Sequence, residues 1–306
     1  MEMRKVFAAE IDNIMENNSN VVLINADLAR PNGVNKLEEK YKDRCFNVGI
    51  AEQNMACVAA GMSSYGFIPF IMTFTPFATR RICDQIAISI AYAKQNVKIV
   101  GTDPGISAEY NGGTHMSVED IGVLRSIPDL VIFEPVDNTQ LKLALPKIVE
   151  YDGAVYIRMF RKELPDVFDE NYKFDLFKAD ILKEGKDVTI ICSGLMVQEV
   201  MEANKTLLEN GVDAEIINVH TIKPLDEETI LKSAKKTGKV IVAENHNIIG
   251  GLRSAVCECL SEKYPVKVIP IGIKDRFGQV GKMQFLKKEY NMDVESIVKA
   301  VNSVIE

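Results

Sequence analysis

Short apolar runs rich in β-branched residues alternate with helix-like patterns along almost the whole chain. Runs of this kind, without polar alternation, are typical of parallel strands that helices cover on both faces. In the first half we expect strands at 21–25, 69–73, 97–101, 130–133 and 155–157, and helices at 5–16, 52–64, 82–93 and 138–151. The pattern predicts an α/β domain built on a parallel sheet.

The alternation stops between residues 161 and 187, where proline, glycine and mixed charges predict a linker over 166–186. It then resumes, with expected strands at 188–192, 214–219, 239–243 and 266–271 and helices at 196–210, 226–236 and 251–263. A chain of 306 residues is long enough for two cores. We therefore expect two three-layer α/β/α domains, 1–165 and 187–306, the second also with a parallel, right-handed sheet.

Composition excludes several classes of protein. The net charge of -7 argues against nonspecific nucleic-acid binding. The first residues lack the apolar core of a signal peptide, and no apolar run approaches the roughly 20 residues of a membrane span. The six cysteines are scattered and the three histidines lie far apart, which fits buried thiols in a reducing cytoplasm and no metal site on this chain. We expect a cytoplasmic protein.

Two segments of the first half combine charge with aromatic rings. Glu52 stands at the start of an expected helix, and Phe74 and Phe77 follow a strand and precede Arg80 and Arg81. A glutamate in a first helical turn is commonly explained by the helix dipole, and paired rings are commonly core. A carboxylate, two rings and a basic pair also suit a flat, cationic heterocycle.

A long, turn-rich loop over residues 101–117 follows another strand. In open α/β sheets ligands bind at the carboxyl ends of the strands, so His115 on this loop is a candidate functional residue. Arg158 and Arg161 end a later strand and could grip a phosphate or carboxylate, or equally form surface ion pairs.

Taken together, the order and spacing of these segments resemble the C-terminal half of a transketolase. The segments that carry the resemblance are 48–55, 73–81, 111–115 with 124–128, and 221–225. The resemblance covers nearly the whole chain. It implies a pyrimidine-binding domain for thiamine diphosphate followed by a transketolase C-terminal domain.

The resemblance also implies roles for the cofactor-facing residues. Glu52 would contact the aminopyrimidine ring and favour the tautomer that activates the cofactor's thiazolium carbon. Phe74 and Phe77 would pack on the pyrimidine. Asp27 would lie near the cofactor and the subunit interface.

For the substrate, the resemblance implies that His115 contacts a sugar hydroxyl or transfers a proton. Arg161 and Arg4 would grip the substrate phosphate, and Arg81 corresponds to a phosphate-binding arginine of deoxyxylulose-phosphate synthases. Asn111 would take a substrate-binding position where typical transketolases have an aspartate.

Two more departures concern the same site: Asp103 replaces a histidine and Pro31 replaces a phosphate-contacting serine of the family pattern. They leave the donor and acceptor sugars open, and a sulfonated sugar is among the candidates.

The chain has no Gly-Asp-Gly motif followed by a distant asparagine, which is the Mg²⁺ and diphosphate site of this family. We therefore expect the small subunit of a split transketolase, with Mg²⁺, diphosphate and further histidines on a larger partner. A heterotetramer is expected, since the full-length family dimerises with sites between subunits. Its reaction would move a two-carbon ketol unit from a ketose phosphate to an aldose phosphate in pentose phosphate metabolism.

Three other interpretations stay open at this point. The beta subunit of a 2-oxo acid dehydrogenase has the same two-domain order and also needs a partner. A fragment similar to deoxyxylulose-phosphate synthase is the second. The third is a catalytically silent regulatory subunit, against which an intact Glu52 with its ring pair argues.

Overall fold

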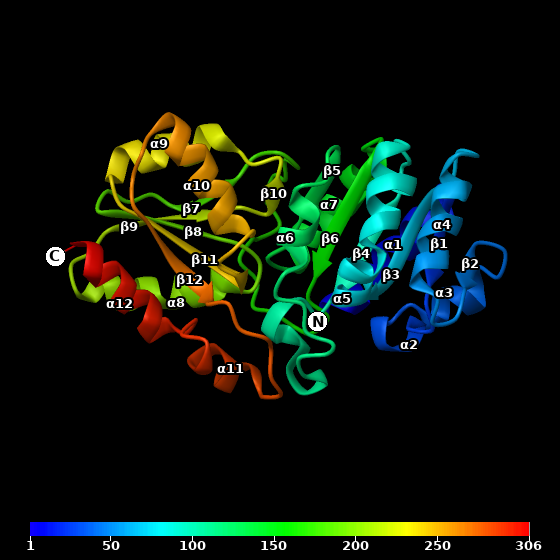
Figure 1. Ribbon diagram of the computed structural model, residues 1–306, viewed down its shortest axis with the longest axis horizontal. Coiled ribbons are helices and arrows are strands. Elements are labelled where there is room, and N and C mark those ends of the chain that lie inside the picture. Colours follow the sequence, from blue (N-terminus) through cyan, green and yellow to red (C-terminus); the bar gives the residue numbers. More distant parts are fainter. Residues whose placement is uncertain (306) are drawn as a thin grey trace. The chain divides into compact units, whose positions relative to one another are not determined.

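The computed structural model describes residues 1–305, which fold into two compact units (Figure 1). The first unit comprises Met1–Pro104 and Val123–Leu176. The second comprises Gly105–Gly122 together with the chain from Phe177 onward. The loop that carries Asn111 and His115 therefore groups with the second unit, which the sequence did not indicate. The expected boundaries at 165 and 187 stay a prediction.

The first unit is built on parallel strands in the order β5-β6-β4-β3-β1-β2. Five of these strands were expected, and their residues are almost all buried, as the continuous apolar runs predict. β2 was missed because three residues are too few for a periodic signal. The bounds are β1 Val21–Asn25, β2 Cys45–Asn47, β3 Ile68–Phe74, β4 Lys98–Thr102, β5 Leu130–Phe133 and β6 Ala154–Met159.

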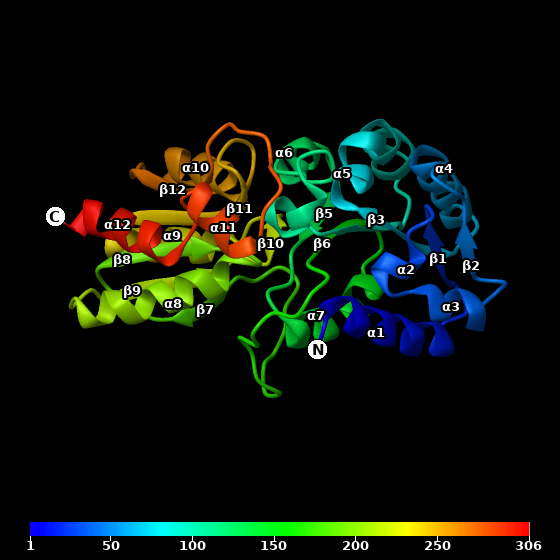
Figure 2. The same cartoon turned by 90° about the horizontal axis from the view of Figure 1, so that it is seen from below.

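Helices cover both faces of this sheet. In Figure 2, α1 and α7 lie on one side of it and α4 on the other. Ala56 and Ala59 on α4 are fully buried, and their small side chains let the helix lie close to β3. The helix expected at 82–93 is shorter and is a π-helix, η2. The bounds are α1 Met3–Asn17, α2 Ala29–Asn32, α3 Asn35–Lys40, α4 Glu52–Ser63, α5 Thr75–Ala78, η1 Arg80–Ile82, η2 Gln85–Tyr92 and α7 Asn138–Glu150, with α6 Asp120–Arg125 at the boundary of the units.

The second unit has the strand order β12-β11-β8-β9-β7. The four expected strands, β8, β9, β11 and β12, are parallel as predicted, and a fifth strand that was not expected, β7, pairs antiparallel with β9. β7 lies inside the expected linker and is half-exposed at the edge of the sheet, so it lacks the apolar run of a central strand. The bounds are β7 Asp180–Lys183, β8 Val188–Cys192, β9 Ala214–Asn218, β10 Thr221–Lys223, β11 Val240–Asn247 and β12 Val268–Ile273.

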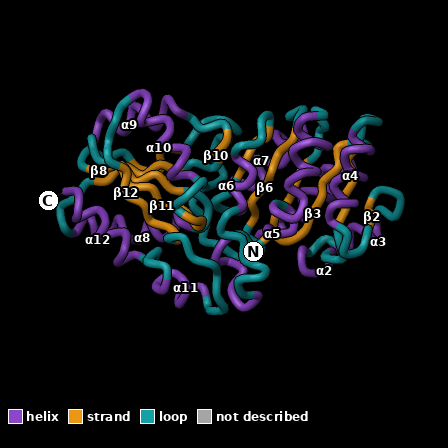
Figure 3. The backbone as a smooth tube through the Cα atoms, viewed as in Figure 1, coloured by secondary structure: helices purple, strands orange, loops and turns teal. Residues whose placement is uncertain are grey.

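Figures 1 and 3 show α9 and α10 on one face of this sheet and α8 and α12 on the other. Three of these helices were expected; α12 was not, although Ile297 and Val301 bury its apolar stripe. In the described chain no helix has both the length and the apolar character needed to cross a membrane. The bounds are η3 Gly105–Asn111, α8 Met196–Glu209, α9 Glu227–Thr237, α10 Leu252–Lys263, α11 Met283–Glu289 and α12 Val294–Ile305.

Candidate active site

Glu52 is the first residue of α4, which begins shortly after β2. Gly49 has a φ of +74°, a left-handed conformation that suits glycine and turns the chain from the strand into the helix. Only 4% of Glu52 is exposed. The unpaired N–H groups and the dipole of a helix N-terminus favour a negative charge there. A buried carboxylate also needs a partner of its own.

That partner is Arg81. Its Nη1 donates a hydrogen bond of 2.7 Å to Glu52 Oε1. The centre of the same guanidinium lies 3.7 Å from the centroid of the Phe77 ring, and the centroids of Phe74 and Phe77 are 6.3 Å apart. The structure thus brings together Glu52, Phe74, Phe77 and Arg81, four of the five residues that the sequence singled out in the two segments. A flat cation is stacked on a ring and bound to the buried carboxylate.

A second group of charges, which we call the arginine cluster, comprises Arg4, Arg161, Asp103 and the carbonyl of Pro31. Arg4 Nη1 and Arg161 Nη1 both donate to the Pro31 oxygen, at 2.8 and 3.1 Å. Arg161 Nε donates to Asp103 Oδ2 at 2.6 Å, and its Nη2 binds the same carboxylate. The Arg161 guanidinium also lies 4.8 Å from the centroid of the Phe74 ring.

The parallel sheet explains why these residues lie at one edge. Phe74, Thr102 and Met159 are neighbours across β3, β4 and β6, so Asp103 and Arg161 follow two adjacent strands at their carboxyl ends. Asp27 follows β1 at the same edge, with its backbone N–H bound to the Asn47 side chain at 3.0 Å.

Asn111 and His115 lie on the loop of the second unit, where Asn111 is exposed and His115 half-exposed. His115 Nδ1 is 2.9 Å from Thr114 Oγ1. The structure places these two predicted substrate residues on this unit, and the other predicted site residues on the first.

The loop is held by the polar end of β11. Asn245 Oδ1 accepts from the Ile106 N–H at 2.9 Å, and the Asn247 N–H donates to the Val118 carbonyl at 2.7 Å. A Cβ on Gly105 would lie 2.2 Å from Asn245 Oδ1, so the backbone passes this side chain closely.

His246 adds a third contact. Its Nδ1 is 2.6 Å from the Asn247 carbonyl oxygen, which can only accept, so Nδ1 carries the hydrogen. Its Nε2 then accepts the Gly122 N–H at 3.3 Å. Sequence reasoning did not single out Asn245 or His246. The signal was a run of polar residues, Glu244–Asn247, ending a buried strand just before two glycines.

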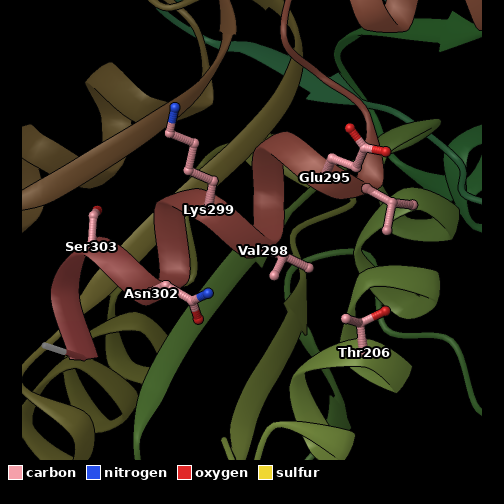
Figure 4. A pocket seen from close by; sticks show the side chains of 7 residues that line it. Thr206, Glu295, Val298, Lys299, Asn302 and Ser303 are labelled. Atoms are coloured by element: carbon pink, nitrogen blue, oxygen red, sulfur yellow. The ribbon is translucent and has the colours of Figure 1, made fainter.

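A surface groove of about 540 Å³ lies elsewhere on the second unit, between α8 and α12 (Figure 4). Its lining residues are Thr206, Val294, Glu295, Val298, Lys299, Asn302 and Ser303. None of the predicted site residues is among them, and we assign the groove no role.

Comparison with known proteins gives the family. The family model for the transketolase pyrimidine binding domain matches residues 1–167, and the model for the transketolase C-terminal domain matches 177–297. The chain belongs to the transketolase family. The resemblance seen in the sequence is thereby confirmed, together with the two-domain α/β fold.

Three transketolase relatives match along nearly their full length. A 6-deoxy-6-sulfo-D-fructose transketolase subunit of Clostridium sp. (strain MSTE9) is 48% identical over 94% of this chain and 89% of the relative. A subunit of an apulose-4-phosphate transketolase from Phocaeicola vulgatus is 33% identical over 97% of this chain and 95% of its own. A solved split-gene transketolase, described as an inactive beta4 tetramer, is 37% identical, with a TM-score of 0.91 and coverage of 100% of this chain and 98% of that one.

Proposed function

We propose that this chain is the cofactor-activating subunit of a split transketolase, which transfers a two-carbon ketol unit from a ketose to an aldose with thiamine diphosphate. The observation that carries the proposal is the buried Glu52, bound to a planar cation that stacks on Phe77. That arrangement is what an aminopyrimidine ring requires of its site.

The residues fit this cofactor in charge and shape. The Arg81 guanidinium is a flat array of N–H donors, held by Glu52 Oε1 and by the face of Phe77. A protonated aminopyrimidine is also flat, cationic and a donor, so it can make the same two contacts. When bound, thiamine diphosphate supplies the reactive carbon that carries the two-carbon unit.

In the proposed mechanism Glu52 holds a proton at the ring nitrogen of the pyrimidine. Glu52 is the first residue of α4, and its burial excludes competing water. Phe74 and Phe77 orient the ring by stacking. Asp27 is proposed to lie beside the cofactor at the same sheet edge.

The substrate's terminal anion is proposed to bind at Arg4 and Arg161, whose forked donors suit tetrahedral oxyanions. His115 and Asn111 are proposed to contact the sugar hydroxyls. The relatives named above act on a sulfonated and a phosphorylated sugar, so both anions are candidates. The role of Arg81 toward a phosphate also stays a prediction.

A larger partner is proposed to supply the Mg²⁺ and the diphosphate site, because this chain lacks the Gly-Asp-Gly motif. The relatives named as subunits support such an arrangement. We propose a heterotetramer of two chains of each kind, working in the cytoplasm.

The test is ketol transfer by the chain reconstituted with its larger partner, Mg²⁺ and thiamine diphosphate. We expect transfer from a ketose with an anionic tail to an aldose phosphate, and a loss of roughly 10²–10⁴-fold in Glu52→Gln. Glu227→Gln is the matched control, since Glu227 is also the first residue of a helix, α9. Activity toward 2-oxo acids only, or full activity of Glu52→Gln, would contradict the proposal.

A further inference from the structure

Two guanidinium groups converge on one oxygen in the arginine cluster. Arg4 and Arg161 both donate to the carbonyl of Pro31, although like charges at this distance repel each other. A bound anion relieves the repulsion and satisfies the remaining donors. On the proposed function, this anion is the tail of the sugar substrate.

Asp103 changes the charge of this site. It is 2% exposed, and its φ of +53° places it in the left-handed region that is uncommon for a residue other than glycine. Its carboxylate accepts from Arg161 Nε at 2.6 Å and from the Arg161 backbone N–H at 3.3 Å, and it also binds Nη2. The Asp103 carboxylate therefore places a negative charge inside the cluster, against the Nε and Nη2 edge of the Arg161 guanidinium.

Arg4 has a carboxylate partner as well. Its Nε and Nη2 donate to the carboxylate oxygens of Glu2 at 3.2–3.3 Å, and Lys5 Nζ lies 3.1 Å from Glu2 Oε2. Lys5 and then Arg4 lower the pKa of Glu2, so Glu2 is ionised at neutral pH. Unlike Asp103, Glu2 is about one-third exposed and water screens its charge.

The two candidate anions differ in charge. A sulfonate carries one negative charge throughout the pH range of protein stability, whereas a phosphate monoester carries about −1.5 to −2 at pH 7, with a second pKa of about 6. Coulomb energy is proportional to the charge of the ligand, so a fixed carboxylate repels a dianion about twice as strongly as a monoanion. The buried carboxylate thus disfavours phosphate more than sulfonate.

We propose that Asp103 is a specificity-determining residue, which shifts the selectivity of the arginine cluster toward a ketose with a singly charged sulfonate tail and away from the matching phosphate. The proposal rests on the proposed ketol transfer at this site. It assigns to Asp103 a role distinct from that of Arg4 and Arg161, which bind either anion.

The test uses the reconstituted enzyme and two ketoses of the same carbon skeleton, one with a terminal sulfonate and one with a terminal phosphate. The measured quantity is the ratio of kcat/KM for sulfonate to kcat/KM for phosphate. We expect Asp103→Asn, which keeps the size of the side chain, to shift this ratio toward phosphate by about tenfold. Asp103→Glu, which keeps the charge, should leave the ratio close to that of the wild type.

A ratio that is unchanged in Asp103→Asn, or that shifts equally in Asp103→Glu, would overturn the proposal. Absence of turnover with either ketose would refute the ketol-transfer function instead, so the two failures are distinguishable.

Discussion

At the scale of single residues, the contact between Arg81 and Glu52 matters most. The guanidinium makes the two contacts that the cofactor's ring is proposed to make, a hydrogen bond to Glu52 and a stack on Phe77. The guanidinium and the pyrimidine ring cannot both stack on the same face of Phe77 and bind the same oxygen of Glu52. Arg81 must therefore move when the ring binds.

This competition predicts the behaviour of Arg81→Gln. Glutamine carries no charge, so Glu52 loses its ionic partner and we expect the isolated chain to lose about 1 kcal/mol of stability in urea unfolding. In the reconstituted enzyme the cofactor should bind more tightly, as measured by calorimetry. Arg80→Gln is the control at the neighbouring, exposed position. Weaker cofactor binding in Arg81→Gln would instead support a direct binding role for Arg81.

Lys98 gives a prediction about pH. Its side chain is fully buried at the start of β4, where Nζ donates to the carbonyls of Tyr151 and Gly153 at 2.7 and 2.8 Å. Burial lowers the pKa of Lys98 to about 7. Above this pKa the folded chain has released the proton, while the unfolded chain holds it up to a pKa of about 10.4.

Between about pH 7 and pH 10 the unfolded chain therefore holds a proton on Lys98 that the folded chain has released. Because stability rises with pH wherever the unfolded chain binds more protons, the free energy of unfolding should fall as the pH drops from about 10 toward 7. The free energy of unfolding of the wild type should thus rise with pH relative to that of Lys98→Met, with a slope of at most about 1.4 kcal/mol per pH unit. Urea unfolding of both proteins at several pH values in this window measures it. Parallel curves for the two proteins would show that Lys98 stays charged in the folded state.

At the scale of elements, sequence and structure agree best where a strand is buried on both faces. β1, β5 and β8 begin and end where the apolar runs do. β2 and β7 are short or half-exposed edge strands, so neither has a pattern of its own. Glu52 and its partner Arg81 are 29 positions apart, in two segments that follow each other along the chain, whereas the contacts of the 105–122 loop join residues more than a hundred positions apart.

The loop contacts predict the effect of Asn245→Ala. Without Oδ1 the Ile106 N–H loses its acceptor, so the loop that carries Asn111 and His115 is held less firmly. We expect kcat/KM for ketol transfer to fall about tenfold while cofactor affinity stays unchanged, and the Ile106 amide to exchange its hydrogen faster. Asn302→Ala, in the groove of Figure 4, is the control. Unchanged kinetics and unchanged exchange would show that Asn245 does not position the loop.

At the scale of the whole molecule, this chain holds one part of a proposed active site. It contributes the carboxylate, the rings and the arginine cluster, while the metal and the diphosphate site are proposed to come from the partner. Sequence motifs gave the family and the candidate residues of both units. They could not give the pairing of Arg81 with Glu52 or of Asp103 with Arg161, because side-chain geometry decides which charges meet.

The most direct test of the central claim is the rate at which the cofactor's reactive C–H exchanges with deuterated solvent, followed by NMR. With the partner and Mg²⁺ present, we expect fast exchange in the wild-type enzyme and in Glu227→Gln. In Glu52→Gln the rate should fall by roughly 10²–10⁴-fold. Exchange in Glu52→Gln as fast as in the wild type would show that Glu52 does not activate the cofactor.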